Sequence, residues 1–535
     1  MADAQAIPVI DLFAGPGGLG EGFSAFTLAN GSKQFRIALS IEMEQWAHKT
    51  LELRSFFHSF PKGKVTAEYY AHLRGEITRG ELFDAFPEAA ETAQRQAWKA
   101  ELGVVEPAIV DHRIRGALDS ADQWVLCGGP PCQAFSVVGR SRNGGIADDD
   151  HRVYLYKQYL RILSVHEPPV FIMENVKGLL SSQVKGNEIF EQMLEDLRHP
   201  AKVIKTPRKS GASYSLFSLL RKPDLTGDPH NPADFIVKCE DYGIPQSRHR
   251  VIILGVRDDL AGQKIPVLEA NSKPVSAYRI LGGLPRLRSG LSRSEDGSAE
   301  WHQALFAILD ADFMHSRRNG ADAQLRERIA RTLVNMHDFH AGRGAEFISC
   351  DPGIDYNPEW FLDADMGGVC NHTSRPHMVP DLHRYLFAAC YGRVHRRSPE
   401  LNDFPSTLHP DHSNLKDALS KGYFDDRFRV QLSNRPATTI TSHISKDGHY
   451  FIHYDEQQCR SLTVREAARL QTFPDNYYFC GPRTHQYRQV GNAVPPLLAH
   501  QIAGLVTQIL KGTHAKAVRT QNSSCAPSAG RYTLD

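Results

Sequence analysis

A cysteine follows two glycines and two prolines in the segment GGPPCQAFS, residues 128–136. The segment comes directly after the apolar run WVLC, which is typical of a buried strand. Free cysteines are most often small core residues, but Pro130 and Pro131 restrict the backbone and remove two hydrogen-bond donors. Because the prolines fix the direction of the chain here, we interpret Cys132 as a candidate nucleophile.

A nucleophilic cysteine needs a second group that activates the electrophile, and the segment FIMENVKGL, residues 171–179, offers a carboxyl. Glu174 comes at the end of an apolar strand pattern and is followed by Asn175. A carboxyl in apolar surroundings favours its protonated form, so Glu174 is a candidate proton donor. A solvated or helix-capping glutamate is the alternative interpretation of this motif on its own.

Two arginines occupy alternate positions in DYGIPQSRHRVIILG, residues 241–255, where the chain enters an apolar strand. Side chains two residues apart on a strand point to the same face, so Arg248 and Arg250 are expected on one face. Arginines at strand edges are common, and the pair gains weight only together with the other motifs.

Glycines gather near the N-terminus in DLFAGPGGLGEGF, residues 11–23, a strand–turn–helix pattern. Three of them match G-x-G-x-x-G, so a dinucleotide is one candidate ligand, and a tight turn without a ligand is another. Asp11 would repel phosphates but could hold an ammonium group, and Glu42 ends the next strand, where a carboxylate can accept both ribose hydroxyls. The two carboxylates favour an adenosine that carries an amino acid, such as S-adenosylmethionine, over NAD.

The elements that must position these residues alternate between short β-rich runs and longer helical stretches. This alternation predicts an α/β fold with a doubly wound, mostly parallel sheet, whose ligands bind at the carboxyl ends of the strands. The expected strands are Val9–Phe13, Arg36–Ile41, Trp124–Cys127, Val170–Met173, Phe235–Cys239 and Val251–Val256, and the expected helices include Tyr154–Ser164 and Asn187–Leu197.

The alternation fades after about residue 259, where arginines, histidines and turn residues become frequent. We therefore expect a second domain there. The expected organisation begins with a catalytic and cofactor-binding domain at 1–258, with a helical insertion at about 61–105, and continues with the second domain at 259–455. A hinge is expected at 456–484, with a helical pattern at 462–475. A helical segment at 485–513 is expected to pack back on the catalytic domain, and a flexible tail is expected at 514–535.

The chain has 535 residues, of which 41% are hydrophobic and 23% charged, enough for two or three domains. Its net charge of +1 means that a nucleic-acid surface would be a local patch. Nine cysteines without a CxxC pair indicate reduced thiols. The start of the chain lacks a signal-peptide pattern, and no apolar run approaches the roughly 18 residues of a membrane span, so we expect a cytoplasmic protein without a membrane segment.

Six segments occur in a fixed order: DLFAGPGG, GGPPCQAFS, MENVKGLL, PQSRHR, LTVREAARLQTFPD and QVGNAVPP. In this order and at these distances they resemble the DNA (cytosine-5) methyltransferase family of bacterial restriction-modification systems. The resemblance covers about residues 7–258 and 430–508 and leaves the middle as the family's variable region, which implies that the second domain is a variable target-recognition domain. It implies the Rossmann-like fold of class I methyltransferases, with S-adenosyl-L-methionine as cofactor and S-adenosyl-L-homocysteine as product.

The resemblance also implies catalytic roles. The Cys132 thiolate would attack carbon 6 of cytosine, and Glu174 would donate to or hydrogen-bond ring nitrogen 3, so that carbon 5 can take the methyl group. Arg250 matches the arginine that contacts cytosine O2. Arg248 would support the loop or bind a phosphate, and Asn175 would hold the Pro-Cys loop in place.

The cofactor residues that the resemblance implies come from both ends of the chain. Met43 is a departure, because many relatives place a Trp beside the ribose acid. Cys350, Cys370, His372 and His377 fit no common zinc spacing, so no metal is expected. The implied set is Phe13 and Pro130 for adenine, Gly15 and Gly17 for the methionine side, Glu42 with Met43 for the ribose, Asp111 for the adenine amino group, and Asn492 and Val494 to complete the pocket.

The target atom is inaccessible inside a stacked duplex, so the base must be flipped out of the helix. Residues 133–150 suit a mobile lid, with Gln133 and Ser136 near the flipped nucleotide and Arg140 and Arg142 on phosphates, although a plain surface loop is the alternative.

A second candidate DNA surface is the stretch 372–397, which holds five arginines and four histidines against one aspartate. It could line a DNA groove through residues such as Arg375 and Arg384, and a solvated basic face is the alternative.

Three functions are compatible with these patterns. The first is a DNA (cytosine-5) methyltransferase that acts as a monomer on duplex DNA, beside a separately encoded restriction endonuclease. The second is an enzyme of the same fold that acts on RNA, and a target domain of about 170 residues favours DNA instead. The third is a catalytically silent cofactor-binding regulator, against which the intact Cys132, Glu174 and Arg250 speak.

Overall fold

The computed structural model describes most of the chain between residues 6 and 523. Cys132, Gln133, Ser136, Arg140 and Arg142 lie outside the described residues, so their roles stay predictions. The described ranges are 6–130, 151–181, 183–184, 187–204, 211–222, 231–260, 265–271, 273–293, 295–315, 322–336, 339–411 and 426–523.

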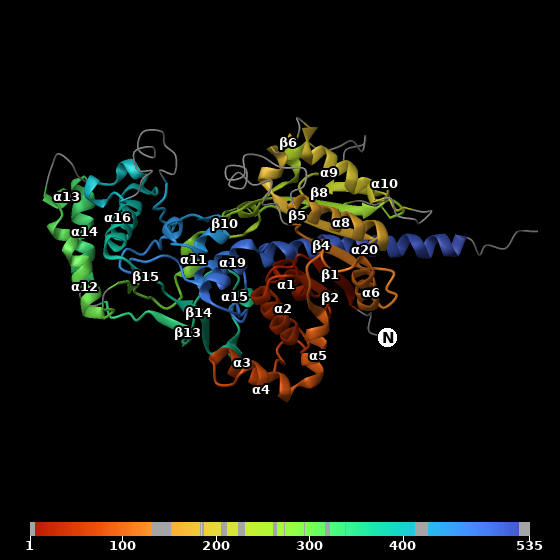
Figure 1. Ribbon diagram of the computed structural model, residues 1–535, viewed down its shortest axis with the longest axis horizontal. Helices are drawn as coiled ribbons and strands as arrows, with labels where there is room; N and C mark the ends of the chain where they lie inside the picture. The colour runs from red at the N-terminus through yellow and green to blue at the C-terminus, as the bar shows by residue number, and fades with distance from the viewer. Residues whose placement is uncertain are drawn as a thin grey trace, which may run out of the picture.

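The core of the first half is a mostly parallel sheet in the order β3-β2-β1-β4-β5-β11-β8, with β9 beside β11 (Figure 1). The first five strands in this order are parallel, and β11 runs antiparallel to β5, β8 and β9. The predicted α/β fold class is thus confirmed. The strands are β1 (Ile7–Leu12), β2 (Phe35–Glu42), β3 (Ala97–Lys99), β4 (Val125–Gly128), β5 (Val170–Val176), β8 (Tyr214–Ser218), β9 (Ile236–Lys238) and β11 (His249–Arg257).

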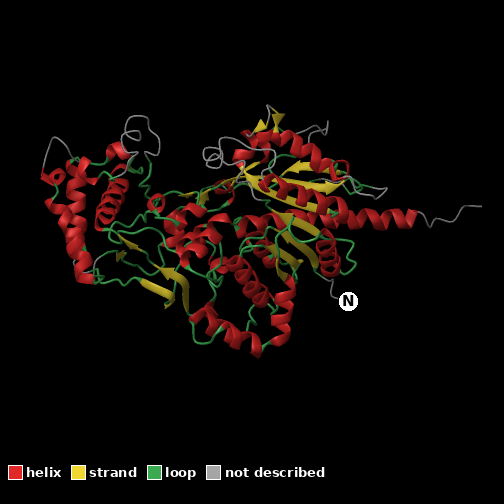
Figure 2. Cartoon of the chain, viewed as in Figure 1, coloured by secondary structure: helices red, strands yellow, loops and turns green. Residues whose placement is uncertain are grey.

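Helices cover both faces of this sheet (Figure 2). Successive strand residues point to opposite faces, so Val9 belongs to one apolar core and Ile10 to the other. The middle parts of the central strands are mostly apolar because both of their faces are buried. On the Val9 side lie α1 (Gly18–Ala25) and α20 (Pro496–Ser523), and on the Ile10 side lie α6 (Pro107–Leu118), α8 (His151–His166) and α9 (Ile189–Arg198).

The predicted insertion is helical as far as Gln96, but the chain then forms β3 at the edge of the sheet. This strand has three residues and follows an Ala-rich helix, so it carries no alternation that a sequence pattern could reveal. The helices α3 (Ala67–Arg74), α4 (Arg79–Ala85) and α5 (Pro87–Gln96) share an apolar core with α2 (Gln45–His58).

In the region after β11 loops connect several helices, and Figure 1 shows the far part of this region on the left, away from the sheet. A separate apolar core holds this far part together, with residues from α12 (Ser298–Phe306), α13 (Asp312–His315), α14 (Ala323–Asn335) and α16 (Val379–His395). The region also contains α11 (Ala277–Leu281) and α15 (Pro358–Phe361), and its paired strands are β12 (Gly290–Leu291) with β15 (Pro376–His377), and β13 (Gly344–Ser349) with β14 (Gly368–Thr373).

A parallel pair of short strands joins the two parts: β10 (Gln246–Ser247), just before β11, pairs with β16 (Ala437–Thr438). The catalytic half also contains β6 (Gln183–Val184), β7 (Asn187–Glu188) and α10 (Pro200–Ile204).

The segment expected as a hinge contains α18 (Val464–Leu470), which is buried throughout. Arg460 pairs with Glu466 at 2.6 Å, and Arg469 pairs with Asp475 at 2.6 Å. Burial acts to raise the pKa of Glu466, but the Arg460 guanidinium outweighs it and holds that pKa well below its usual range. This segment is therefore a packed junction between the two parts of the chain.

The C-terminal segment expected to be helical forms two helices, α19 (Arg483–Asn492) and α20, separated at Ala493–Pro495. The prolines there cannot continue a helix. α20 runs to Ser523, ten residues past the expected start of the flexible tail. The stretch 483–511 is long and apolar enough to pass a test for a membrane span, but 78% of its most apolar window is buried in the fold, as in a core helix.

Candidate active site

Part of the expected site meets at one edge of the sheet. This edge is formed by the carboxyl ends of β1, β2, β4 and β5, and β11 reaches it with its first residues because it runs in the opposite direction. The residues at this edge are Phe13 after β1, Glu42 at the end of β2, Gly129 and Pro130 after β4, Glu174 on β5 and Arg250 on β11.

Glu174 and Arg250 form an ion pair at this edge. Arg250 Nε lies 2.9 Å from Glu174 Oε1, and the side chains are 13% and 14% exposed. In the sheet Arg250 is opposite Val176, so the pair is diagonal across the two strands. Arg250 Nη1 also donates to the backbone oxygen of its neighbour His249 at 2.8 Å. The carboxyl is thus held in one orientation and still reaches solvent.

Gly129 lies directly against this carboxyl. A Cβ atom on Gly129 would be only 2.8 Å from Glu174 Oε2, so a side chain there would displace the carboxylate. The glycine in GGPPC therefore allows the end of β4 to approach Glu174 closely. Cys132 follows three residues later, outside the described part of the chain.

Arg248 has a different environment from Arg250. It is 1% exposed, and its guanidinium donates to the backbone oxygens of Ile440 at 2.6 Å and Gly491 at 3.1 Å. Burial, aided by the positive charge of Arg250, lowers the pKa of Arg248 to about 9. Arg248 precedes β11, so strand alternation does not place it beside Arg250. The expected phosphate contact is wrong, since Arg248 is buried and clamps two chain segments.

Asn175 is also buried, at 2% exposure, and its Oδ1 accepts a hydrogen bond from the Val176 backbone N–H at 2.9 Å. Its support of the Pro-Cys loop stays a prediction.

The glycine turn after β1 contacts the acid at the end of β2. The Gly15 backbone N–H donates to Glu42 Oε2 at 2.8 Å, and that of Glu44 donates to Oε1 at 2.7 Å. Gly17 has φ +93°, which favours glycine, while Phe13 adopts φ +55° without being glycine. Left-handed backbone at a bulky residue costs of order 1–3 kcal/mol and is concentrated at functional sites. The strained backbone therefore indicates that this turn has a function besides reversing the direction of the chain.

Asp11 lies behind this turn and not in it. The residue is 1% exposed, and neither carboxylate oxygen has a hydrogen-bond partner of normal geometry among the described residues, with Cys127 and Gly20 as polar neighbours. Burial raises the pKa of Asp11 to about 7. The expected contact with a ligand ammonium group is wrong, because the carboxyl is enclosed between β1 and α1.

The far end of the chain meets the turn as expected. A Cβ atom on Gly18 would lie 2.1 Å from the backbone oxygen of Val494, so this segment packs directly on the start of α1. Asn492 is exposed at the end of α19, and the Tyr477 hydroxyl donates to the backbone oxygen of Pro16. Two C-terminal segments thus support the glycine turn.

Asp111 is not at the edge. It accepts hydrogen bonds on α6 from Arg161 at 2.8 Å and from His166 at 2.9 Å, and His166 precedes the amino end of β5. The expected contact with adenine is wrong, since Arg161 and His166 of α8 occupy the carboxylate. The acid that follows β3 at the carboxyl edge is Glu101, and the Ala100 N–H donates to the Glu42 backbone oxygen at 3.0 Å. Sequence reasoning missed Glu101 because β3 was read as helix.

Two large apolar side chains are exposed on the loops that follow β2 and β3 at the same edge: Met43 is 54% exposed and Val104 is 66% exposed. Exposed apolar side chains at the ligand-binding edge of an α/β sheet are suited to packing on the face of a bound ring.

The arginines expected to contact DNA in the second domain are buried. Arg375 donates to the backbone oxygens of Lys446 at 2.8 Å and Ile444 at 2.7 Å, and Arg384 pairs with Asp381 at 2.7 Å. Both are 8% exposed. These two DNA contacts are wrong, because the guanidinium groups stabilise the second domain from inside.

Cys370 and His372 serve the same buried network, where Arg465 donates to Cys370 Sγ at 2.9 Å and His372 contacts the Thr463 hydroxyl at 2.8 Å. Among the described residues, no group of three or more His, Cys, Asp or Glu side chains is arranged to hold a metal ion.

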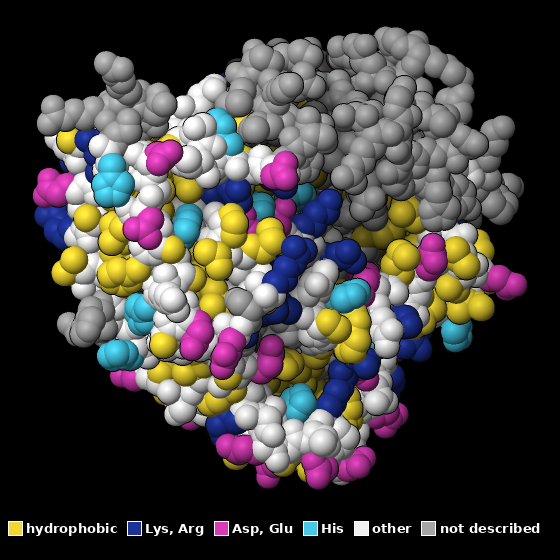
Figure 3. All heavy atoms as spheres, turned by 60° about the vertical axis from the view of Figure 1, so that its left-hand side comes forward, with side chains coloured by type: hydrophobic (Ala, Val, Ile, Leu, Met, Phe, Trp, Pro, Cys, Tyr) yellow, Lys and Arg dark blue, Asp and Glu magenta, His cyan; other side chains and the backbone are white. Residues whose placement is uncertain are grey.

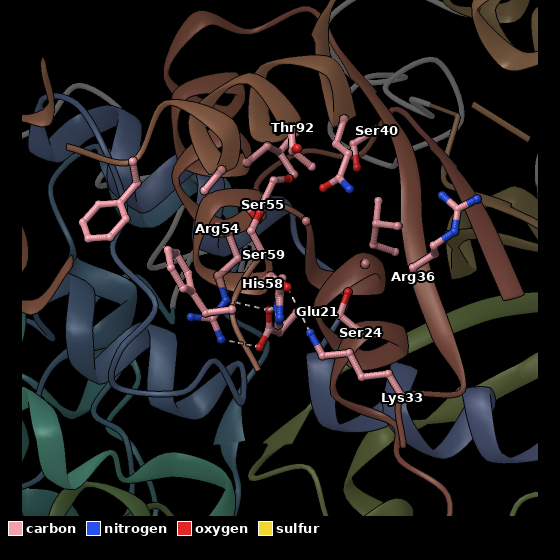
Figure 4. Close-up of a pocket in the computed structure, with 18 of the residues that line it drawn as sticks. Glu21, Ser24, Lys33, Arg36, Ser40, Arg54, Ser55, His58, Ser59 and Thr92 are labelled. Atoms are coloured by element: carbon pink, nitrogen blue, oxygen red, sulfur yellow. Dashed lines mark hydrogen bonds and ion pairs between the residues drawn. The ribbon is translucent and has the colours of Figure 1, made fainter. Parts of the chain in front are cut away.

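A cavity of about 640 Å³ lies behind the turn, between α1, β2, α2 and α5 (Figure 4). Arg54 and His58 of α2 both point to Glu21 of α1, at 2.5 Å and 2.8 Å. Although burial acts to raise it, these two cations hold the pKa of Glu21 well below its usual range. The cavity shares only Gly17 with the expected cofactor set, so it is a separate space. Its ion pairs fix α1, which begins at the turn.

The chain matches the family described as C-5 cytosine-specific DNA methylase over residues 91–200, 233–349 and 365–508. It therefore belongs to this family, and it is a DNA (cytosine-5-)-methyltransferase.

Individual relatives agree with this assignment. The chain is 31% identical to the type II methyltransferase M.Bpa9945I of Bacillus paralicheniformis, over 95% of this chain and 100% of the relative. It is 27% identical to the type II methyltransferase M.AgeI of Thalassovita gelatinovora, over 92% and 97% of the two chains. It is 25% identical to the DNA (cytosine-5-)-methyltransferase M.ApeKI of Aeropyrum pernix, over 74% and 83%.

Proposed function

We propose that this enzyme transfers a methyl group from S-adenosylmethionine to carbon 5 of a cytosine in a specific duplex DNA sequence, by base flipping and covalent catalysis through Cys132. The observation that carries the proposal is the Glu174–Arg250 ion pair at the carboxyl edge of the sheet, with Gly129 against the carboxylate. Cys132 is three residues after Gly129, and three residues of chain span at most about 11 Å. Cys132 is therefore close enough along the chain to reach this edge.

The chemistry assigns one task to each group. The Cys132 thiolate adds to carbon 6 of the cytosine, and electron density moves to carbon 5 and to ring nitrogen 3. Glu174 donates a proton to nitrogen 3, which neutralises the charge there, and takes this proton back when the carbon–sulfur bond later breaks. Arg250 contacts O2 and keeps the carboxyl in place. After carbon 5 has gained the methyl group, its proton leaves to a base and the carbon–sulfur bond breaks, which returns the thiolate.

The residues at the edge fit S-adenosylmethionine, which supplies the methyl group when bound. Glu42 would hold the ribose, and its carboxylate already fixes the Gly15 N–H. Phe13, Met43 and Val104 provide apolar surface for the adenine, and we propose that Glu101 replaces Asp111 as the acid for the adenine amino group. Gly15, Gly17, Pro130, Asn492 and Val494 would complete the pocket.

We propose that residues 133–150 contact the flipped nucleotide and its phosphates, with Gln133, Ser136, Arg140 and Arg142 as the contacting residues, and that the second domain reads the sequence. The names of the relatives support a type II restriction-modification role beside a separately encoded endonuclease. The enzyme would act as a monomer on duplex DNA in the cytoplasm, where the nucleoid provides its substrate.

The test is transfer of labelled methyl groups from S-adenosylmethionine to unmethylated duplex DNA, compared with RNA of the same base composition. Wild-type protein is expected to label duplex DNA at one sequence, and Cys132→Ala is expected to bind cofactor without transfer. Labelling of RNA alone would replace the proposal with an RNA methyltransferase.

A further inference from the structure

The arginine-rich stretch 372–397 has two kinds of arginine. Three of the five have their guanidinium groups bound within the protein: Arg375 and Arg384 are buried, and Arg397 pairs with Asp403 at 2.7 Å. Arg393 and Arg396 are exposed, and within the described chain their side chains have no hydrogen-bond, ion-pair or ring partner. The sequence cannot separate these two groups, and the structure does.

Both free arginines line one cavity of about 420 Å³ at the C-terminal end of α16. The described residues that line it include no Asp or Glu, so none of them offsets the two positive charges. The other lining residues are Ala389, Gly392, Val430, Gln431, Leu432, Ser433, Asn434 and Tyr454. A recess with two cations, polar Ser and Asn side chains and apolar walls matches the edge of a base pair better than a bare phosphate, which needs no apolar contact.

Hydrogen bonds that involve the backbone hold the walls of this recess in place, and the guanidinium groups of Arg393 and Arg396 have no partner among the described residues. Arg396 ends α16 with φ +57°, and its backbone oxygen accepts from Arg435 Nη2 at 3.1 Å. Gln431 Oε1 accepts from the Thr438 N–H at 2.9 Å, and the Tyr278 N–H donates to the Ser433 backbone oxygen at 3.0 Å. The recess is thus pre-organised, which lowers the entropy lost when a ligand binds.

The chain connects the recess to the catalytic edge. The wall segment runs from Val430 into β16, which pairs with β10 immediately before Arg248, and Arg248 donates to the Ile440 backbone oxygen. From Asn434 to Ala437 and from Gln246 to Arg250 the chain spans about 25 Å at most, and the strand pair adds about 5 Å. The recess is therefore within about 30 Å of Arg250, less than one turn of duplex DNA.

The surface agrees with a nucleic-acid partner. On the face that Figure 3 shows, Lys and Arg side chains gather in a band across the middle of the molecule. Because the whole chain carries a net charge of only +1, such a concentration is local.

We propose that Arg393 and Arg396 are specificity-determining residues that read guanine edges in the recognition sequence beside the target cytosine. This inference rests on the proposed methylation of duplex DNA. The planar fork of an arginine matches O6 and N7 of guanine in one fixed geometry, whereas lysine is a flexible point charge that fits the two acceptors less well.

The experiment is methylation of a library of duplexes with randomised bases around a cytosine, followed by sequencing of the methylated positions. The proteins are wild type, Arg393→Ala, Arg396→Ala, the charge-preserving Arg393→Lys and Arg396→Lys, and the control Arg331→Ala. Arg331 is an exposed arginine on α14 of the same helical region, outside the recess.

Each arginine variant, including the lysine forms, is expected to relax the preference for guanine at one position by about 10- to 100-fold while cofactor binding is unchanged. Arg331→Ala is expected to keep the wild-type preference. An unchanged preference, or an equal loss at all sequences with a lower salt dependence, as for a phosphate contact, would overturn the inference. A wild-type protein that binds cofactor and methylates no duplex would instead refute the proposed function.

Discussion

Arg250 Nε and Glu174 Oε1 are 2.9 Å apart on two antiparallel strands whose ends meet the carboxyl ends of the parallel strands. The contact joins two residues that are 76 positions apart in sequence, and it fixes a carboxyl at the point where the GGPP segment leaves β4. In our proposal this ion pair lies at the base of the cytosine pocket.

Glu174→Gln keeps the shape of the side chain and removes its charge. We expect the rate of methyl transfer in a single turnover to fall at least about 100-fold, because glutamine cannot transfer a proton to ring nitrogen 3, with cofactor affinity unchanged. The matched control is Glu240→Gln, which removes the carboxylate that pairs with His249 at 2.8 Å. If both variants lost activity equally, Glu174 would have only a structural role.

Arg248 is predicted to act as a positioning residue. Arg248→Met leaves the backbone oxygens of Ile440 and Gly491 without their donor, and Gly491 leads into the segment that packs on the glycine turn. We expect KM for S-adenosylmethionine to rise at least about tenfold with a smaller change in kcat, and Arg248→Lys to restore part of the loss. A lower kcat with an unchanged KM would contradict this role.

Arg375 provides a direct contrast with Arg393. Because Arg375 is buried and bonded to two backbone oxygens, Arg375→Ala is expected to lower the free energy of unfolding by at least about 2 kcal/mol, with normal sequence preference in the protein that stays folded. Urea unfolding and library methylation measure the two effects. A stable Arg375→Ala protein with altered sequence preference would indicate that Arg375 contacts DNA.

Asp11 predicts a pH dependence of stability. Its pKa is raised from an ordinary 3.8 to about 7, so the folded protein holds this proton more tightly than the unfolded chain. The resulting stability is present at low pH and is lost as the pH rises to about 7. Relative to wild type, Asp11→Asn should therefore gain stability from pH 5 to 7, by up to about 1.4 kcal/mol per pH unit, and then level off.

Urea unfolding of wild-type and Asp11→Asn protein at pH 5.5, 7 and 8.5 measures this difference. A difference that stays constant over the range would show that the Asp11 carboxyl is not buried as described.

The positions of acids at strand ends can be predicted well from the sequence. An acid that directly follows a buried apolar strand must lie at the edge of the sheet where that strand ends. Glu42 and Glu174 both lie at the expected edge. Asp11 also ends an apolar run, but whether its carboxyl faces the turn or the space below α1 depends on how the helix packs. The sequence carries no direct signal for that packing.

The basic stretch shows the same limit more clearly. Arg384 and Arg393 are on one helix nine residues apart, and only the first finds an acid and two backbone oxygens around it. Those partners come from residues 381, 408 and 409, and so the sorting of arginines into buried and free groups is decided by tertiary contacts. β3 was missed for a different reason, since three residues are too few for a pattern.

The central claim is that the Cys132 sulfur forms a covalent bond with carbon 6 of a flipped cytosine. The most direct measurement uses a duplex with 5-fluorocytosine at the methylated position, S-adenosylmethionine, denaturing electrophoresis and peptide mass spectrometry. Fluorine at carbon 5 cannot leave as a proton does, so the adduct persists. We expect a stable protein–DNA adduct at Cys132 in wild type and none in Cys132→Ala. An adduct at another residue, or rapid methylation of ordinary DNA by Cys132→Ala, would contradict the account.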